Sequence, residues 1–119
     1  MEIIDIANEI DKKIGDLEVL RKKLKTYAED RAIKSGEYDK EIALTLIALK
    51  NGQEFELEGE KICNPPATTT EKIARGICWK DAIEKETSDG FYKALLTNIN
   101  VLQAQLNGLQ SIYRHLSEK

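Results

Sequence analysis

The side chains best suited to chemistry are few, and none lies in a recognisable catalytic pattern. His115, the sole histidine, follows Arg114 near the end of a predicted helix, where cations meet the negative end of the helix dipole. A catalytic histidine would need a nucleophile and an orienting partner, and the sequence indicates neither. Cys63 and Cys78 are the two cysteines and have no metal-ligand spacing. We expect both to serve as small apolar residues in a reducing cytosol, although the sequence leaves a disulfide between them open.

Acidic side chains alternate along residues 54–60, on one face of a possible strand: Glu54, Glu56, Glu58 and Glu60. Such a face could bind a cation, but Asp, Asn and Gly do not follow at the spacing of a calcium loop, so a solvated strand face is the better interpretation. The glycines match no phosphate-binding motif. The sequence therefore predicts no enzyme, no metal site and no cofactor.

Basic residues along the N-terminal part suggest a second chemistry, the binding of phosphate groups. The candidate contacts with nucleic acid are Arg21, Lys22, Lys25, Arg31 and Lys34. A phosphate-binding patch normally has few acids nearby, whereas this stretch also contains Glu18, Glu29 and Asp30. We interpret the run chiefly as the solvated flank of a coiled coil and keep nucleic-acid binding as the alternative function.

The stretch that organises the chain is residues 91–116. One row of apolar residues recurs every seven residues, and a second row is offset by three or four: Leu95, Leu102, Leu109 and Leu116, then Tyr92, Ile99, Leu106 and Tyr113. Two rows sustained over several heptads predict a coiled coil or a long helical hairpin.

The outer face of this helix is unusual because no residue between Lys93 and Arg114 is charged. Asn, Gln and Thr occupy the outer positions, and neutral amides can be buried at lower cost than charges while still forming hydrogen bonds. We predict a helix that is covered on more than one side; the alternative is an ordinary amphipathic helix with a neutral outer face. The predicted oligomer and partner interface is Leu95, Ile99, Leu102, Gln103, Leu106, Leu109, Gln110 and Tyr113.

Residues 1–50 form the other predicted helical arm, with apolar residues every three or four positions from Ile3 to Tyr27. Ser35 and Gly36 predict a kink or a short break. Residues 38–49 are apolar on nearly all sides, so they must be buried on several sides. A homodimer of hairpins, or a higher oligomer, would supply the helices that cover them.

Between the arms we expect a helix C-cap at Gly52, a β-hairpin over 53–63 and a short helix over 68–77. Thr68 and Glu71 have the spacing of a capping box at the start of the short helix. The return arm is predicted over 79–117, with a bend at residues 88–90. Large aromatic residues are expected to form a local core under the hairpin: Phe55, Trp79 and Phe91.

The chain has 119 residues, of which 41% are apolar, and a net charge of -3. One domain, 1–119, is the expectation at this length. The mixed charge provides no strong attraction to nucleic acid or membrane surfaces, and no apolar run is long enough to span a membrane. The fold class is therefore predicted as mainly α: a long antiparallel helical hairpin, or coiled coil, with a small β-hairpin and a short helix at one end.

Three segments carry a resemblance: LKNGQEFELEGEKICNPP (49–66), IARGICWK (73–80) and LNGLQSIYRHL (106–116). They resemble a family of small proteins encoded in phages and prophages of Gram-positive bacteria. The resemblance covers about the C-terminal two-thirds, whereas residues 1–40 match only as a generic coiled coil. It transfers no catalytic residue, and it implies the cytoplasm of the host cell and a phage-borne accessory role.

The resulting functional prediction is a non-enzymatic protein that acts by protein–protein binding. Its expected partners are itself and a host or phage protein, as an inhibitor or modulator of a host-defence or DNA-metabolism protein. The alternative is a nucleic-acid-binding accessory factor in phage recombination.

Overall fold

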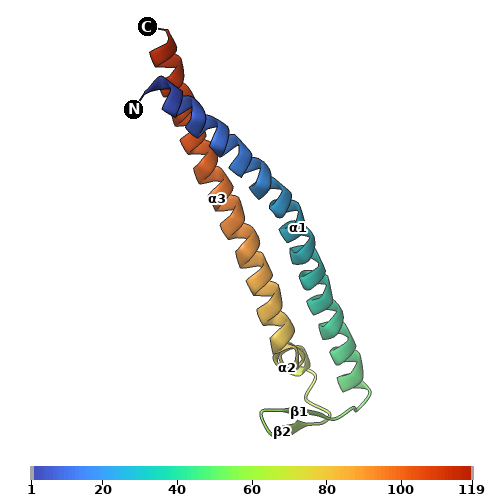
Figure 1. Cartoon of the computed structure of the whole chain (residues 1–119). Helices are drawn as coiled ribbons and strands as arrows, with labels where there is room; N and C mark the ends of the chain where they lie inside the picture. Colours follow the sequence, from blue (N-terminus) through green and yellow to red (C-terminus); the bar gives the residue numbers. More distant parts are fainter. Residues whose placement is uncertain (1, 119) are drawn as a thin grey trace. The chain divides into compact units, whose positions relative to one another are not determined.

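Two long helices account for most of the chain. The computed structural model describes residues 2–118. In chain order, the elements are α1 (Ile3–Lys50), β1 (Phe55–Leu57), β2 (Glu60–Ile62), α2 (Thr70–Ile77) and α3 (Trp79–Ser117) (Figure 1). The predicted fold class is confirmed: the protein is mainly α, with two long helices packed together and a small antiparallel hairpin and a short helix between them.

The chain divides into two units, and each is described by itself. Unit 1 is formed by residues 1–29 and 90–119, and unit 2 by residues 30–89. Unit 1 therefore combines the first part of α1 with the last part of α3. Unit 2 contains the second part of α1, the hairpin, α2 and the first part of α3.

In unit 1, the two helix segments lie side by side and run in opposite directions (blue and orange to red in Figure 1). Lys13 Nζ on α1 donates a hydrogen bond to Gln105 Oε1 on α3 over 3.4 Å. Further along α1, Arg21 Nη2 donates to Gln103 Oε1 over 2.9 Å. The buried core between them is Leu17, Leu95, Ile99 and Leu106, and the half-buried residues packed against it are Ile10, Leu20, Leu24 and Leu102.

In unit 2, α1 ends at a C-cap at Gly52, as the sequence predicts, and the structure shows that this cap is a Schellman motif. Gly52 has a φ of 83°. Its N–H donates to the Leu49 carbonyl over 3.1 Å, and the N–H of Gln53 donates to the Ala48 carbonyl over 3.0 Å. These two bonds satisfy carbonyl groups that the end of a helix leaves without partners. The helix therefore stops where glycine can adopt a left-handed backbone.

The hairpin pairs Phe55 with Ile62 and Leu57 with Glu60 in an antiparallel register. Glu58 and Gly59 form its turn, with φ values of 51° and 79°. Positive φ at both central residues is typical of a type I′ turn, whose twist matches that of the strands. The hairpin packs on α2, where a Cβ built on Gly76 would lie 3.5 Å from Leu57 Cδ2.

The start of α2 differs from the prediction. Thr69 is the N-cap, its side chain makes no capping bond, and the helix begins at Thr70. Instead, the hydroxyls of Thr69 and Thr70 both donate to the Pro66 carbonyl, over 3.1 and 2.9 Å. The predicted capping box at Thr68 is thus wrong, because these hydroxyls bond to the preceding turn rather than to the first helical N–H groups.

Both long helices are continuous through the positions where the sequence suggested an interruption. α1 has no break at Ser35 and Gly36, and α3 continues through residues 88–90; a kink at 35–36 stays a prediction. Inside unit 2, buried Ser88 donates to Asp30 Oδ2 over 2.5 Å. Arg31 Nε lies 2.7 Å from Asp89 Oδ1. These contacts between α1 and α3 hold the helical backbone across the glycine-containing stretch.

The predicted aromatic core under the hairpin does not form. Trp79 is 44% exposed and Phe91 is 62% exposed, and Phe91 belongs to unit 1 rather than unit 2. The buried side chains of unit 2 are smaller or aliphatic: Thr45, Leu49, Thr70, Ala74, Cys78 and Ser88. The sequence prediction was wrong because burial here is provided by close packing of small residues, which no aromatic spacing indicates.

Candidate functional site

Of the side chains considered for catalysis, His115 belongs to unit 1, whereas Cys63 and Cys78 belong to unit 2. His115 is exposed in the last turn of α3. Cys63 is free and exposed, whereas Cys78 is free and buried, with its Sγ 3.4 Å from Thr45 Oγ1. Among residues 2–118, no three His, Cys, Asp or Glu side chains gather closely enough to hold a metal ion. On the hairpin, Glu54 forms an exposed ion pair of 3.8 Å with Lys61.

The predicted nucleic-acid contacts are distributed over both units. Arg21, Lys22 and Lys25 are exposed in unit 1, and Arg21 binds Gln103. In unit 2, Arg31 pairs with Asp89, and Lys34 Nζ lies 3.9 Å from Glu37 and 3.7 Å from Glu84. Carboxylates next to Arg31 and Lys34 already balance charge that phosphate groups would otherwise neutralise.

The predicted interface on α3 divides into inner and outer residues. Leu95, Ile99 and Leu106 are buried against Leu17, and Leu102 packs beside them. Gln103 and Leu109 are half-buried, and Gln110 and Tyr113 are exposed. The leucine and isoleucine rows thus meet α1 within unit 1. Contact of the eight residues with another molecule stays a prediction, and Gln110 and Tyr113 are the most accessible of them.

The outer amide positions of α3 are open to solvent in the single chain. Asn98, Asn100, Gln105 and Asn107 are all exposed. Gln103 and Asn107 are linked by a hydrogen bond from Nε2 to Oδ1 over 3.0 Å. The neutral surface identified in the sequence is therefore present and accessible, and its coverage by a second molecule stays a prediction.

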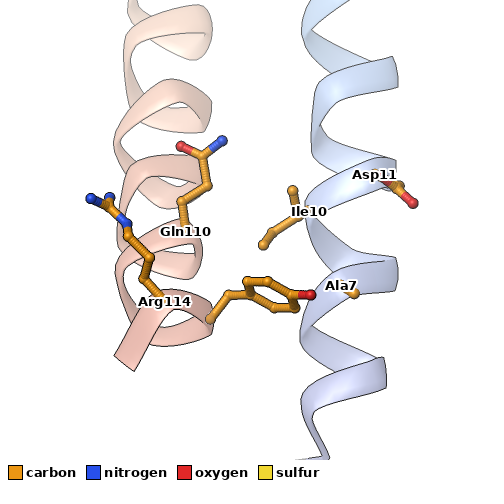
Figure 2. A pocket seen from close by; sticks show the side chains of 6 residues that line it. Ala7, Ile10, Asp11, Gln110 and Arg114 are labelled. Carbon is orange, nitrogen blue, oxygen red and sulfur yellow. The ribbon is translucent and has the colours of Figure 1, made fainter. Parts of the chain in front are cut away.

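A groove of about 460 Å³ lies between α1 and α3 in unit 1, which we call the terminal groove. Its lining residues are Ala7, Ile10, Asp11, Gln110, Tyr113 and Arg114. Figure 2 shows Ile10 extending between the two helices, with Asp11 and Arg114 toward the outer edges. The groove therefore combines an apolar floor with one carboxylate and one guanidinium at its margins.

The interface predicted from the sequence contains two of the six residues that line this groove. These are Gln110 and Tyr113, whereas Asp11 and Arg114 were not among the predicted site residues. Pairing them requires knowing that residues near 10 lie beside residues near 113. An antiparallel hairpin with arms of equal length would have indicated this proximity.

A second groove of about 380 Å³ lies in unit 1, and the atoms exposed on its walls are nearly all carbon, including those of polar side chains. Its lining residues are Glu9, Lys13, Gln105, Gly108, Leu109 and Ile112. On α3, residues 105, 108 and 112 lie on roughly the opposite side from residues 110 and 114, because successive residues rotate by about 100°. The last turns of α3 thus have a hollow on each side.

Unit 2 adds large apolar side chains on its outer surface. On α1, Ile33, Leu44 and Ile47 are 50–57% exposed, and on α3, Ile83 is 55% exposed. Large exposed apolar residues over both units are more typical of surfaces that bind other proteins than of isolated solvated helices. This observation indicates oligomer formation or partner binding, without identifying the partner.

No described helix has both the length and the apolar character required to cross a lipid bilayer. Comparison of the chain with models of protein families, with curated proteins and with solved structures found no match.

Proposed function

We propose that the chain is a non-enzymatic binding protein that acts through protein–protein contacts, both with a second copy of itself and with another protein. The observation that carries this proposal is the exposed, uncharged and partly apolar surface of helices that already bury Leu17, Leu95, Ile99 and Leu106 against one another inside unit 1. A helix that needed only its intramolecular partner would be expected to carry charged pairs on its outer face.

The terminal groove is the surface that we assign to the other protein. Its floor of Ala7 and Ile10 can accept an apolar side chain, and Tyr113 can contribute both ring contact and a hydroxyl group. Asp11 and Arg114 offer one charge of each sign, which favours a partner segment with an apolar anchor between a basic and an acidic residue.

The setting implied by the resemblance supports a specific biological version of this proposal. A phage-encoded protein in the cytoplasm of a Gram-positive host would bind a host-defence or DNA-metabolism protein and inhibit or modulate it. This version rests on the resemblance of residues 49–66, 73–80 and 106–116, whereas protein binding itself is inferred from the exposed surface of α3 and the terminal groove.

The alternative, nucleic-acid binding, is less well supported. Arg31 and Lys34 each lie within ion-pair distance of a carboxylate, and Arg21 is hydrogen-bonded to an amide. Phosphate contacts are strongest at low salt. A gel shift with single- and double-stranded DNA and RNA at low ionic strength therefore tests this alternative, and a salt-sensitive shift that Lys22→Glu weakens would favour it over protein binding.

The protein-binding proposal is tested by affinity capture from a lysate of a Gram-positive bacterium. We expect the full chain to retain a protein in a fixed molar ratio, and the variant Arg114→Glu to lose it while remaining helical by circular dichroism. Lys22→Glu makes the same charge change at an exposed position outside the groove, so it should retain the partner. Capture of nothing except the chain itself, or equal capture by both variants, would contradict the assignment of the groove.

A further inference from the structure

α3 carries another row of residues at heptad spacing, on a face that α1 leaves exposed in unit 1. Alternating steps of three and four residues connect Phe91, Ala94, Asn98, Val101, Gln105, Gly108 and Ile112. We call this row the second seam. All seven residues are exposed, including Phe91 at 62%, Val101 at 52% and Ile112 at 50%. The second seam lies about 100° around the helix from the row of Leu95, Ile99 and Leu106 that faces α1.

The second seam has the same chemical order in both directions from Val101. An amide, a small residue and a large apolar residue follow on each side: Asn98, Ala94 and Phe91 toward the N-terminus, and Gln105, Gly108 and Ile112 toward the C-terminus. A two-fold symmetric contact brings each position opposite its mirror position, so it requires a self-complementary surface. We therefore propose that the second seam joins two copies of this chain, with their α3 helices antiparallel and the two-fold axis at Val101.

In this arrangement, every pair across the axis is chemically matched. Asn98 lies opposite Gln105 of the second copy, where two amides can exchange hydrogen bonds. Gln105 Oε1 already accepts a bond from Lys13 over 3.4 Å, so its amide N–H groups are available for Asn98. Phe91 meets Ile112 of the second copy at both ends. No like charges face each other, because residues 94–113 contain none.

Gly108 is placed where close approach is required. A Cβ built on Gly108 would have no heavy atom within 4 Å, so no contact within the single chain explains a glycine here. In the middle of a helix, glycine costs roughly 1 kcal/mol relative to alanine. Opposite Ala94 of the second copy, the missing side chain lets the two backbones approach and extends the contact between the helices.

The size of the seam sets the expected affinity. From residue 91 to 112 it extends about 32 Å at 1.5 Å per residue. A face of this length and roughly 10 Å wide buries about 300 Å² per copy, below the ~800 Å² of a standard stable interface. Glu9 and Lys13 line the groove next to Gly108, so the edge of α1 adds to the contact. We expect a dimer with a dissociation constant in the micromolar range.

This inference deepens the self-association within the proposed function and rests on it. The first test is sedimentation equilibrium of the full chain up to submillimolar concentration. Val101→Glu places two carboxylates against each other on the axis, so it should raise the dissociation constant at least about 100-fold. Ala104→Glu is the matched control, because Ala104 is exposed on the same helix but lies outside the second seam. Both variants should keep the wild-type helical content, since neither residue is buried.

The second test measures direction and register by thiol crosslinking in a Cys63→Ser background, which removes the exposed native thiol. Chains with Asn98→Cys and chains with Gln105→Cys are mixed and treated with a short bis-maleimide. The antiparallel arrangement predicts a crosslink in the mixture and little in either variant alone. A crosslink of Asn98→Cys chains with themselves would overturn the antiparallel arrangement.

The results of these experiments distinguish failure of the second seam from failure of the proposed self-association. A wild-type chain that stays monomeric at every concentration refutes self-association as a whole. A dimer that tolerates Val101→Glu retains self-association but refutes the second seam. If the chain is monomeric and Val101→Glu abolishes capture of another protein, the seam binds that protein and the symmetric contact is refuted.

Discussion

The core of unit 1 leads to a quantitative prediction at Leu17. This side chain is 2% exposed and is the one α1 residue in the buried cluster, where it meets Leu95, Ile99 and Leu106. Leu17→Ala removes three buried carbon atoms. At about 0.8 kcal/mol per buried methylene, the lost transfer free energy is about 2.4 kcal/mol. The cavity adds a further cost that depends on how far the site collapses.

We expect a total loss near 3 kcal/mol in the free energy of unfolding. This value lies in the lower part of the usual range of destabilisation for Leu→Ala at a buried position, because a core only two helices thick can relax around the deletion. For a chain of 119 residues, the unfolding entropy is roughly 0.25 kcal/mol per kelvin, so Tm should fall by about 12 °C. Urea unfolding followed by far-UV circular dichroism measures the free energy of unfolding, and thermal unfolding followed by the same signal measures Tm, both at one fixed protein concentration.

Leu44→Ala is the matched control. It deletes the same atoms from α1, but Leu44 is 50% exposed, so we expect a loss of about 1 kcal/mol or less. Protein concentration must be equal in the two experiments, because association would stabilise the folded state. If Leu17→Ala costs no more than Leu44→Ala, the cluster around Leu17 does not hold unit 1 together, and the reasoning from burial is refuted.

Three further predictions address other parts of the chain. Leu106→Asp should destabilise the protein by at least about 3 kcal/mol, because it leaves an unpaired charge in the core; cooperative thermal unfolding near the wild-type Tm would show that this row does not form the core. Replacing Glu54 and Glu56 by Lys should change the free energy of unfolding by less than about 0.5 kcal/mol in urea titrations, as is typical of exposed positions, and loss of the fold would make these carboxylates structural. Gly36→Ala should raise Tm in calorimetry by roughly 4 °C, equivalent to about 1 kcal/mol, since the added methyl group meets open space within α1; a lower Tm would indicate a hidden contact or a strained backbone there.

Periodicity predicted most of the fold. The heptad rows led to α3, the alternation around Phe55 and Leu57 led to β1, and Gly52 marked the end of α1. These signals are local: each depends on the repeat of a helix or strand, or on a backbone conformation that glycine adopts easily. The bounds of α3, 79–117, agree with the prediction for the same reason.

The errors arise where a residue's partner is distant in sequence. The hydroxyls of Thr69 and Thr70 bond to the Pro66 carbonyl, so the capping box predicted from the spacing of Thr68 and Glu71 does not form. Ser88 is buried against α1 with a bond to Asp30, a contact that the local sequence does not indicate, and a bend at residues 88–90 stays a prediction. Charge and spacing in one segment cannot indicate which residues of the opposite arm will lie beside it.

For the candidate site too, the sequence indicated the local features but not the contacts between the two arms. The absence of charge between residues 93 and 114 was visible in the sequence, and the structure adds that the outer positions are exposed within the single chain. The terminal groove was not predicted, although the predicted antiparallel hairpin already implies that residues near Ile10 lie beside residues near Tyr113.

The composition of α3 is difficult to explain by the stability of one chain. Asn98, Asn100 and Asn107 are exposed in the helix interior, where each is roughly 0.4 kcal/mol less favourable than lysine or glutamate, and Gly108 adds about 1 kcal/mol. Together these four residues cost about 2 kcal/mol of helix stability, and the contact with α1 recovers none of it at Asn98 or Gly108. A contact between molecules at the second seam explains the part of this cost that falls on Asn98 and Gly108, since amides can be buried in pairs and glycine permits close approach. If Gly108→Ala raised Tm and left the dimer unchanged, this explanation would fail, and α3 would be an ordinary helix with a neutral outer face.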